Sequence, residues 1–140
     1  MSWRSLVSLL WRLKVTTTIL LASAYADSTT VINEIHYHPA NGSQTEWIEL
    51  ANTMSYDMDL GGWQLTGAVE YTFPKDTTIA ASEFLVVAAD PSKVRLRSAF
   101  EKALGPFEGN LSNQGERIEL RNVANRVMSV VNYNDREPWP

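Results

Sequence analysis

The sequence predicts an all-β protein: an immunoglobulin-like β-sandwich with one short inserted helix, preceded by an N-terminal signal peptide. The first observation is a pair of near-identical heptapeptides, Glu46–Asn52 and Glu116–Asn122, which agree at five of seven positions. The second is a series of about seven short strand-like segments with turn residues roughly every 8–12 positions, a pattern typical of two-sheet sandwiches. The third is a single segment with helical periodicity, which we place in a connection between strands.

The first 26 residues are predicted to be a signal peptide. Arg4, Arg12 and Lys14 supply positive charge, Val15–Ala24 is mostly apolar, and Ala24–Ala26 offers small residues for cleavage. The apolar run has about half of the roughly 20 residues that a membrane-spanning helix needs. We therefore expect cleavage after residue 26, no transmembrane segment in the mature chain, and a periplasmic, cell-surface or extracellular location. The alternative is an uncleaved amphipathic anchor built on Trp3, Leu6, Leu10 and Trp11.

Charge and cysteine content exclude several classes of function. The chain has 12 basic and 16 acidic residues, and its net charge is −4. The signal peptide holds three of the basic and none of the acidic residues, so the mature chain keeps nine basic against 16 acidic residues, a net charge of −7. Such a surface predicts no specific nucleic-acid partner, because nucleic-acid binding rests first on neutralising phosphates. The absence of Cys excludes thiolate metal sites and thiol catalysis, and leaves stability to burial.

Each heptapeptide predicts a half-buried strand. Ile and Leu stand two residues apart with Glu between them, which gives one apolar and one acidic face. Asn52 and Asn122 then predict turns, because an Asn side chain bonds nearby backbone. The continuous apolar run at 84–89 is typical of a strand covered on both faces. Further strands are predicted at 31–37, 60–65, 71–73 and 127–133.

One segment predicts a helix. Asp90 is a suitable N-cap and Pro91 suits the first helical position, and Gly105-Pro106 predicts the end. Between them an amphipathic stripe recurs at i, i+3, i+4, i+7 and i+8, formed by Leu96, Ala99, Phe100, Ala103 and Leu104.

Several motifs in this order and spacing resemble the lamin tail domain, and in particular its bacterial, exported members. They are Val31–Ile35, Glu46–Leu50 with Asn52, Asp59-Leu60, Gly62-Trp63 with Leu65, Tyr71–Pro74, Leu111–Asn113, Gly115-Glu116 and Ile118–Leu120. The similarity covers roughly Thr30 to Pro140. It implies an immunoglobulin-like domain over residues 27–140 that has no enzymatic activity or cofactor of its own, accompanies secreted or cell-surface enzymes, and binds or tethers partners.

The resemblance also raises a question about the last strand. Members of the family usually continue into one further strand after a motif like Pro138–Pro140. Either the sequence is a truncated fragment of a larger protein, or another chain completes the domain by adding a strand to an open sheet edge. The two interpretations predict different oligomeric states.

His36 and His38, the only two histidines of the chain, are the candidate metal ligands. They stand at i and i+2, so both side chains could point to one face of a strand. A zinc site needs three or four ligands, and carboxylates would have to supply the rest. The alternative is a pair of partly exposed polar residues at a strand end, and we predict no metal site.

The carboxylates have equally simple explanations. Asp57 and Asp59 resemble half of a calcium loop, but position twelve of that loop is Ala68, which cannot ligate. The glutamates at 34, 46, 49, 116 and 119 could supply an acid/base pair or bind cations or a basic partner. Because they alternate with aliphatic residues, we expect them to form the wet outer faces of the sheets.

Trp47 and a cluster of basic residues are the candidate binding residues. Trp47 should face away from Ile48, either toward solvent, where it could contact sugar or protein, or beneath the loop at 41–44. Arg95, Arg97 and Lys102, with Lys93, could form a basic patch for an anionic polymer such as a surface glycan or extracellular DNA. They are also the expected solvated face of a surface helix.

We therefore predict a non-catalytic, exported binding or tethering module, whose partner is a protein or a cell-surface polymer. It would act alone or as part of a larger secreted protein. The sequence contains no G-x-S-x-G, G-x-x-x-x-G-K-[ST] or H-E-x-x-H motif. The alternatives are a carbohydrate-binding or adhesive sandwich and a metal-dependent hydrolase fragment. The last would require His36, His38 and a carboxylate to converge.

Overall fold

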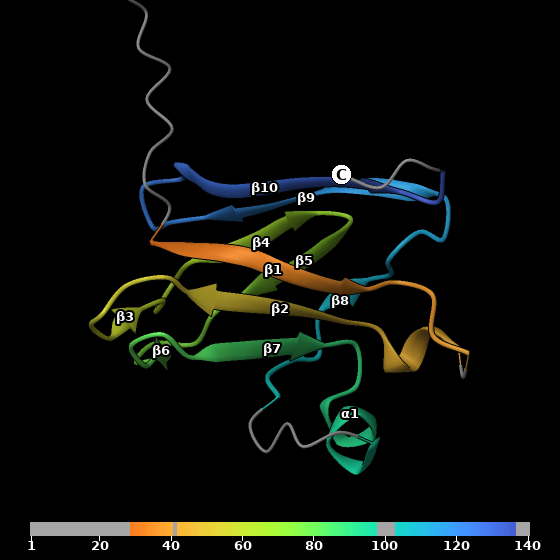
Figure 1. Cartoon of the computed structure of the whole chain (residues 1–140), viewed down its shortest axis with the longest axis horizontal. Coiled ribbons are helices and arrows are strands. Elements are labelled where there is room, and N and C mark those ends of the chain that lie inside the picture. Colours follow the sequence, from red (N-terminus) through yellow and green to blue (C-terminus); the bar gives the residue numbers. More distant parts are fainter. Residues whose placement is uncertain (1–28, 41, 98–102, 137–140) are drawn as a thin grey trace, which may run out of the picture.

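A computed structural model describes residues 29–40, 42–97 and 103–136, and the predicted signal peptide lies outside these ranges. The described chain is mostly β, with two facing sheets, a two-stranded ribbon and one short α-helix (Figure 1). The first sheet is antiparallel and has the order β1 (Thr30–His36), β2 (Trp47–Asn52), β7 (Phe84–Ala88). The second has the order β10 (Val127–Asn134), β9 (Gly115–Arg121), β4 (Gln64–Gly67), β5 (Val69–Thr72), β8 (Glu108–Gly109). The ribbon pairs β3 (Met58–Asp59) with β6 (Thr78–Ile79).

The two heptapeptides form the strands β2 and β9, each in the interior of its sheet. Ile48, Leu50, Ile118 and Leu120 are fully buried in one hydrophobic core between the sheets. Trp63 and Phe73 belong to the same core. The predicted apolar faces of both strands are therefore confirmed, and they bring the repeated sequences together from opposite layers.

Both heptapeptides end in an Asn that bonds to backbone, as predicted. The Asn52 side-chain amide donates to the carbonyl oxygens of Tyr56, Ile79 and Ala80 at 2.8, 3.1 and 3.0 Å. Asn122 Oδ1 accepts hydrogen bonds from the amides of Ala124 and Arg126, both at 3.0 Å. Asn52 thus joins the end of β2 to the ribbon, whereas Asn122 closes only its local turn.

The helix differs from its prediction. Helix α1 spans Pro91–Arg97, and residues 98–102 lie outside the described ranges. Leu104 was predicted as the end of the helical stripe, but it extends the edge of β7: its amide donates to Val86 at 2.8 Å and its carbonyl accepts from Ala88 at 2.9 Å. The edge of β7 offers unpaired backbone groups, and satisfying them competes with continuing the helix.

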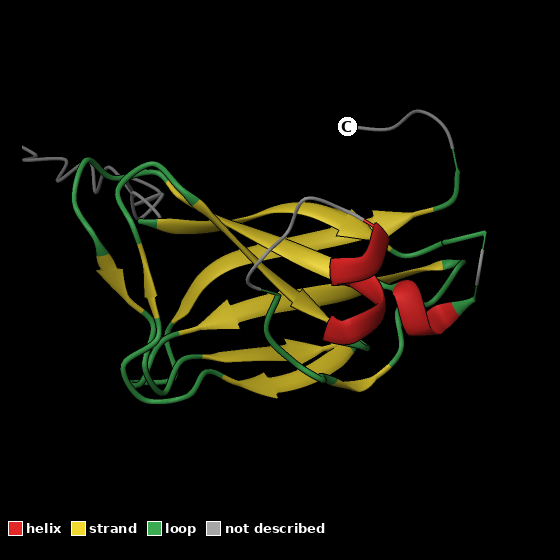
Figure 2. Ribbon diagram, turned by 90° about the horizontal axis from the view of Figure 1, so that it is seen from below, coloured by secondary structure: helices red, strands yellow, loops and turns green. Residues whose placement is uncertain are grey.

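Helix α1 covers the outer face of the first sheet at the end of β7. Val94 packs with Val86, Ala88 and Ala103, and Trp47 borders this cluster. The 3₁₀ helix η1 (Ser43–Thr45) lies at the same end of the sandwich as α1 (Figure 2). The two-residue strands β3, β6 and β8 were not predicted, because segments this short carry no periodicity.

Candidate functional site

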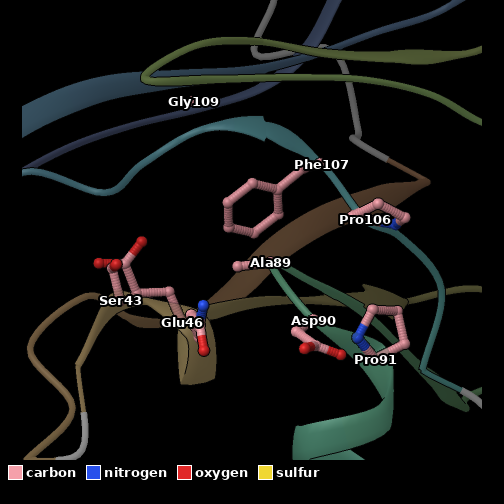
Figure 3. A pocket seen from close by; sticks show the side chains of 9 residues that line it. Ser43, Glu46, Ala89, Asp90, Pro91, Pro106, Phe107 and Gly109 are labelled. Carbon is pink, nitrogen blue, oxygen red and sulfur yellow. The ribbon is translucent and has the colours of Figure 1, made fainter.

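A hollow of about 400 Å³, the Glu46 hollow, opens at the end of the sandwich where η1, the β7–α1 junction and the segment 106–109 meet. Figure 3 shows Phe107 and Pro106 on one side, facing Ser43 and Glu46 and the start of α1. Its lining combines apolar and polar side chains: Ala89, Pro91, Pro106 and Phe107 with Ser43, Gln44, Glu46 and Asp90, beside Gly109.

Glu46 is the most buried acidic residue of this hollow, with 3% of its surface exposed. Its Oε2 accepts a hydrogen bond from the amide of Leu111 at 2.9 Å. Within the described part of the chain, no group donates a hydrogen bond to Oε1. This oxygen is also not completely enclosed by protein atoms. Oε1 therefore keeps a small exposed area, and Glu46 is one of the residues that line the hollow. Burial raises the pKa of Glu46, and the Leu111 hydrogen bond opposes that rise.

Asp90, the second carboxylate of the hollow, already serves the helix. Its Oδ1 accepts from Ser92 Oγ at 2.6 Å and from the Ser92 amide at 3.1 Å, and Lys93 Nζ lies 3.5 Å from its Oδ2. The Ser92 hydroxyl is the main reason why the pKa of Asp90 is lowered. Asp90 therefore stays ionised and caps α1, as its position predicted.

A second hollow of about 260 Å³, the β1–β10 cleft, runs between the two sheets along one side of the sandwich. Both bordering strands are terminal in their sheets. The cleft is lined by Ile32, Asn33, Glu34, Ile35, Tyr37, Val131, Asn132, Tyr133 and Asn134. The Ile32 amide donates to Ser129 Oγ at 3.1 Å near one end, and the rings of Tyr37 and Tyr133 lie 4.8 Å apart at the other.

Tyr133 connects the two hollows electrostatically. Burial is the main cause that raises the pKa of its hydroxyl to about 12, and the nearby carboxylates of Glu116 and Glu46 raise it further. The raised pKa keeps the Tyr133 hydroxyl itself neutral at physiological pH.

The two candidate metal ligands, His36 and His38, each stack on a different aromatic ring. The His36 ring stacks on Trp47 with centroids 5.3 Å apart, and His38 lies beyond the end of β1 with its ring stacked on Tyr37 at 6.5 Å. Residues 29–40, 42–97 and 103–136 contain no group of three or more His, Cys, Asp or Glu side chains that could hold a metal ion. Asp59 accepts a hydrogen bond from the amide of Gly61, two residues on, as a turn residue does, whereas Asp57 accepts one from the amide of Ala81, 24 residues away in the sequence.

The prediction that five glutamates form the wet outer faces of the sheets was wrong for three of them. Glu46, Glu49 and Glu119 are 3%, 8% and 8% exposed, whereas Glu34 and Glu116 are exposed. Partners explain the difference. Glu49 accepts from the Asn33 side-chain amide at 2.8 Å. Glu119 lies between two arginines: it accepts from Arg117 Nε at 2.8 Å and forms an ion pair with Arg121. Charge-assisted hydrogen bonds offset the cost of removing a carboxylate from water.

The candidate binding residues lie near α1. Trp47 is half-buried between the His36 ring and the cluster under α1. Arg95 and Arg97 belong to α1, whose side chains are not described at these positions, and Lys102 lies outside the described ranges. The part these residues play in binding stays a prediction.

Sequence reasoning missed both hollows. For the Glu46 hollow the usable signal is Glu46 itself, which is one of the candidate carboxylates; Glu116, its counterpart in the repeat, is not among the lining residues. Nothing in the local sequence around Ile35 and Val131 predicts the cleft. Local sequence does not determine how far apart the edges of two sheets lie.

The fold is that of a small immunoglobulin-like sandwich with two hollows on its surface. A scan against protein-family models matches the Lamin Tail Domain over residues 23–135. The chain therefore belongs to the lamin tail domain family, as its motifs predicted; the fold is generally that of a non-catalytic interaction module. A search of curated proteins found no match. In the described part of the chain, no helix is long and apolar enough to cross a membrane.

Proposed function

We propose that this protein is an exported, non-catalytic module that tethers a partner protein through the β1–β10 cleft. The observation that carries the proposal is the position of the cleft between two terminal strands, with Ile32, Ile35 and Val131 among its walls. A terminal strand presents backbone amides and carbonyls that can pair with another chain. Export is supported by the charge and length of the N-terminal segment.

The cleft suits an extended peptide that pairs with the outer edge of β10, along which no further strand pairs among the described residues. In this mode the backbone hydrogen bonds supply affinity, and alternate side chains enter pockets that supply specificity. An apolar side chain of the peptide would enter the space between Ile35 and Val131. Asn132 and Asn134, which also line the cleft, can bond the polar side chains or the backbone of the peptide.

Site-specific photo-crosslinking in the producing cells tests this surface. A photo-reactive residue at Asn132, an exposed position of the cleft, should crosslink to a second polypeptide. The same residue at Glu83, which is exposed just before β7, is the control and should yield no such product. Asn132→Lys should prevent a reporter at Asn134 from crosslinking, because charge on a strand edge opposes pairing.

Two results would contradict this function. Crosslinking at Glu83 as strongly as at Asn132 would show that contact is non-specific. Retention of the protein by a polysaccharide, lost in Trp47→Ala, would instead favour the carbohydrate-binding class.

Cell fractionation tests export separately. The mature protein should begin at Asp27 by N-terminal sequencing and should be found outside the cytoplasm. A membrane-bound product that still begins at Met1 would favour the uncleaved anchor.

A further inference from the structure

We propose that the Glu46 hollow is a second recognition site, which takes the side chain of a lysine on a partner polypeptide. This inference does not depend on the β1–β10 cleft or on export. It rests on two features that lie together. Glu46 is a buried carboxylate with one oxygen that accepts no hydrogen bond from the described residues, and it lines an opening with apolar walls and a second carboxylate, Asp90.

The free oxygen of Glu46 is the first step. A carboxylate that is 97% buried is costly unless each oxygen has a partner. Oε2 has the Leu111 amide, and Oε1 has no donor among the described residues. A cation that reached Oε1 would therefore gain an ion pair in a poorly hydrated place, where such pairs are stronger than at the surface.

The number of free oxygens selects the kind of cation. Arginine binds carboxylates best through two parallel hydrogen bonds to two oxygens, and Oε2 of Glu46 is already occupied by Leu111. The lysine ammonium is a compact point charge that can use a single oxygen. A metal ion would need more ligands than the described residues bring together.

The walls suit the remainder of a lysine side chain. Ala89, Pro91 and Phe107 are apolar lining residues, and the four methylenes of lysine favour such surfaces while the charged head seeks a polar group. The volume of about 400 Å³ is ample for one side chain with some water.

Charge around the opening also favours a cation. Asp90 lines the hollow and stays ionised, and the lining residues that belong to the described part of the chain include no Lys or Arg. Lys93 is near, but it is paired with Asp90. The net charge of the chain is −4, so the field of the whole protein attracts a basic partner segment.

The test is a titration of the isotopically labelled protein with Nα-acetyl-lysine methylamide, followed by nuclear magnetic resonance. The backbone amides of Leu111 and Gly109 should shift, because one bonds to Glu46 and the other lines the hollow. The neutral probes, the Nε-acetyl-lysine and norleucine analogues, should bind at least about tenfold more weakly, and the arginine analogue should also be weaker.

Variants of the two carboxylates supply the second arm. Glu46→Gln keeps an acceptor for the Leu111 amide and removes the charge, and it should weaken lysine binding by at least about tenfold. Asp90→Asn keeps an N-cap residue and should have a smaller effect. Glu83→Gln removes the same charge from an exposed position outside the hollow lining, and it should bind like the unchanged protein.

Equal binding of the lysine and norleucine probes would overturn the proposal, because the hollow would then recognise only apolar groups. Absence of any shift at Leu111 and Gly109, or an equal loss in Glu83→Gln and Glu46→Gln, would also overturn it. The comparison of neutral and charged probes on the unchanged protein remains decisive even if Glu46→Gln fails to fold.

Discussion

Glu46 and Glu116, the first residues of the two heptapeptides, bind adjacent amides of one loop. Oε2 of Glu46 accepts from Leu111 at 2.9 Å, and Oε2 of Glu116 accepts from Ser112 at 3.2 Å. Since the heptapeptides belong to opposite sheets, the repeated glutamate fastens the same loop to both layers of the sandwich. This arrangement places the loop beside the Glu46 hollow.

Removing the Glu46 side chain should destabilise the protein. Glu46→Ala leaves the buried Leu111 amide without its acceptor, so the free energy of unfolding should fall by about 1–3 kcal/mol. Glu46→Gln keeps an acceptor and should cost less. Urea denaturation measures both, with Glu116→Ala as the matched control, because Glu116 is exposed and its bond is longer. A loss as large for Glu116→Ala would show that burial of Glu46 contributes little.

Glu46 and Glu119 should have opposite effects on the pH dependence of stability. The pKa of Glu46 is raised by burial, so its contribution is present below its ordinary value of 4.5 and is lost as pH rises through the raised value. The pKa of Glu119 is lowered, first by the Arg117 hydrogen bond, so its contribution is present above 4.5 and is lost as pH falls through the lowered value.

As pH rises through the acid range, Glu46→Gln should therefore become more stable relative to the unchanged protein. Over the same range, Glu119→Gln should become less stable relative to the unchanged protein. Thermal unfolding at a series of pH values measures both differences. Two differences of the same sign would contradict the assignment of Glu46 as desolvated and Glu119 as paired.

Tyr133 should limit stability at alkaline pH. Its pKa is raised from 10 to about 12, so the neutral phenol contributes stability below pH 10 that is lost as pH rises toward 12. The unchanged protein should therefore lose stability relative to Tyr133→Phe in this range. Unfolding at a series of alkaline pH values measures the difference, with Tyr56→Phe as the control at an exposed tyrosine. Parallel curves for the two variants would contradict this role.

Local periodicity predicted most of the fold, because its rules depend on near neighbours. Alternation in the heptapeptides predicted that Ile48 and Ile118 face the core, and the Asn after each strand predicted its backbone bonds. The end of the helix could not be predicted from local sequence. Leu104 pairs with the edge of β7, a strand that precedes it by fifteen or more residues.

Long-range partners also decided which carboxylates are buried. Glu46 and Glu116 occupy the same place in the repeat, yet only Glu46 is buried, because the chain from Phe107 to Leu111 crosses over it. The Glu46 hollow follows from that crossing. Its other walls come from η1 and the start of α1, so no local pattern contains the site.

Asn52 should matter more for stability than its counterpart Asn122. Asn52→Ala leaves the carbonyls of Tyr56, Ile79 and Ala80 without their shared donor, and should cost about 2–3 kcal/mol. Asn122→Ala removes bonds within an exposed turn and should cost about 0.5–1 kcal/mol. Chemical denaturation measures both, and equal losses would contradict the proposed tie between β2 and the ribbon. Asn52→Asp should be as harmful as Asn52→Ala, since a carboxylate would face carbonyl oxygens.

Replacing Gly67 should destabilise the protein more than replacing Gly42, although both glycines have a positive φ. Gly67 has φ +103° and Gly42 has φ +86°, so an alanine is strained at either position. At Gly67 the new Cβ would also overlap the carbonyl oxygen of Arg117, which accepts a 3.0 Å hydrogen bond from Ala68. Within the described residues, and apart from the two chain neighbours of Gly42, no atom lies within 4 Å of a Cβ at that position.

Gly67→Ala should therefore cost about 2–4 kcal/mol, since overpacking adds to backbone strain, and Gly42→Ala about 1 kcal/mol. Hydrogen exchange should locate the damage, because separating Ala68 from Arg117 opens the pairing of β4 with β9. Faster exchange confined to that pair in Gly67→Ala, with the β1–β2 pair unchanged, is the expected result. If both variants lost the same stability, backbone conformation alone would explain the requirement for glycine, and the close approach of β9 would play no part.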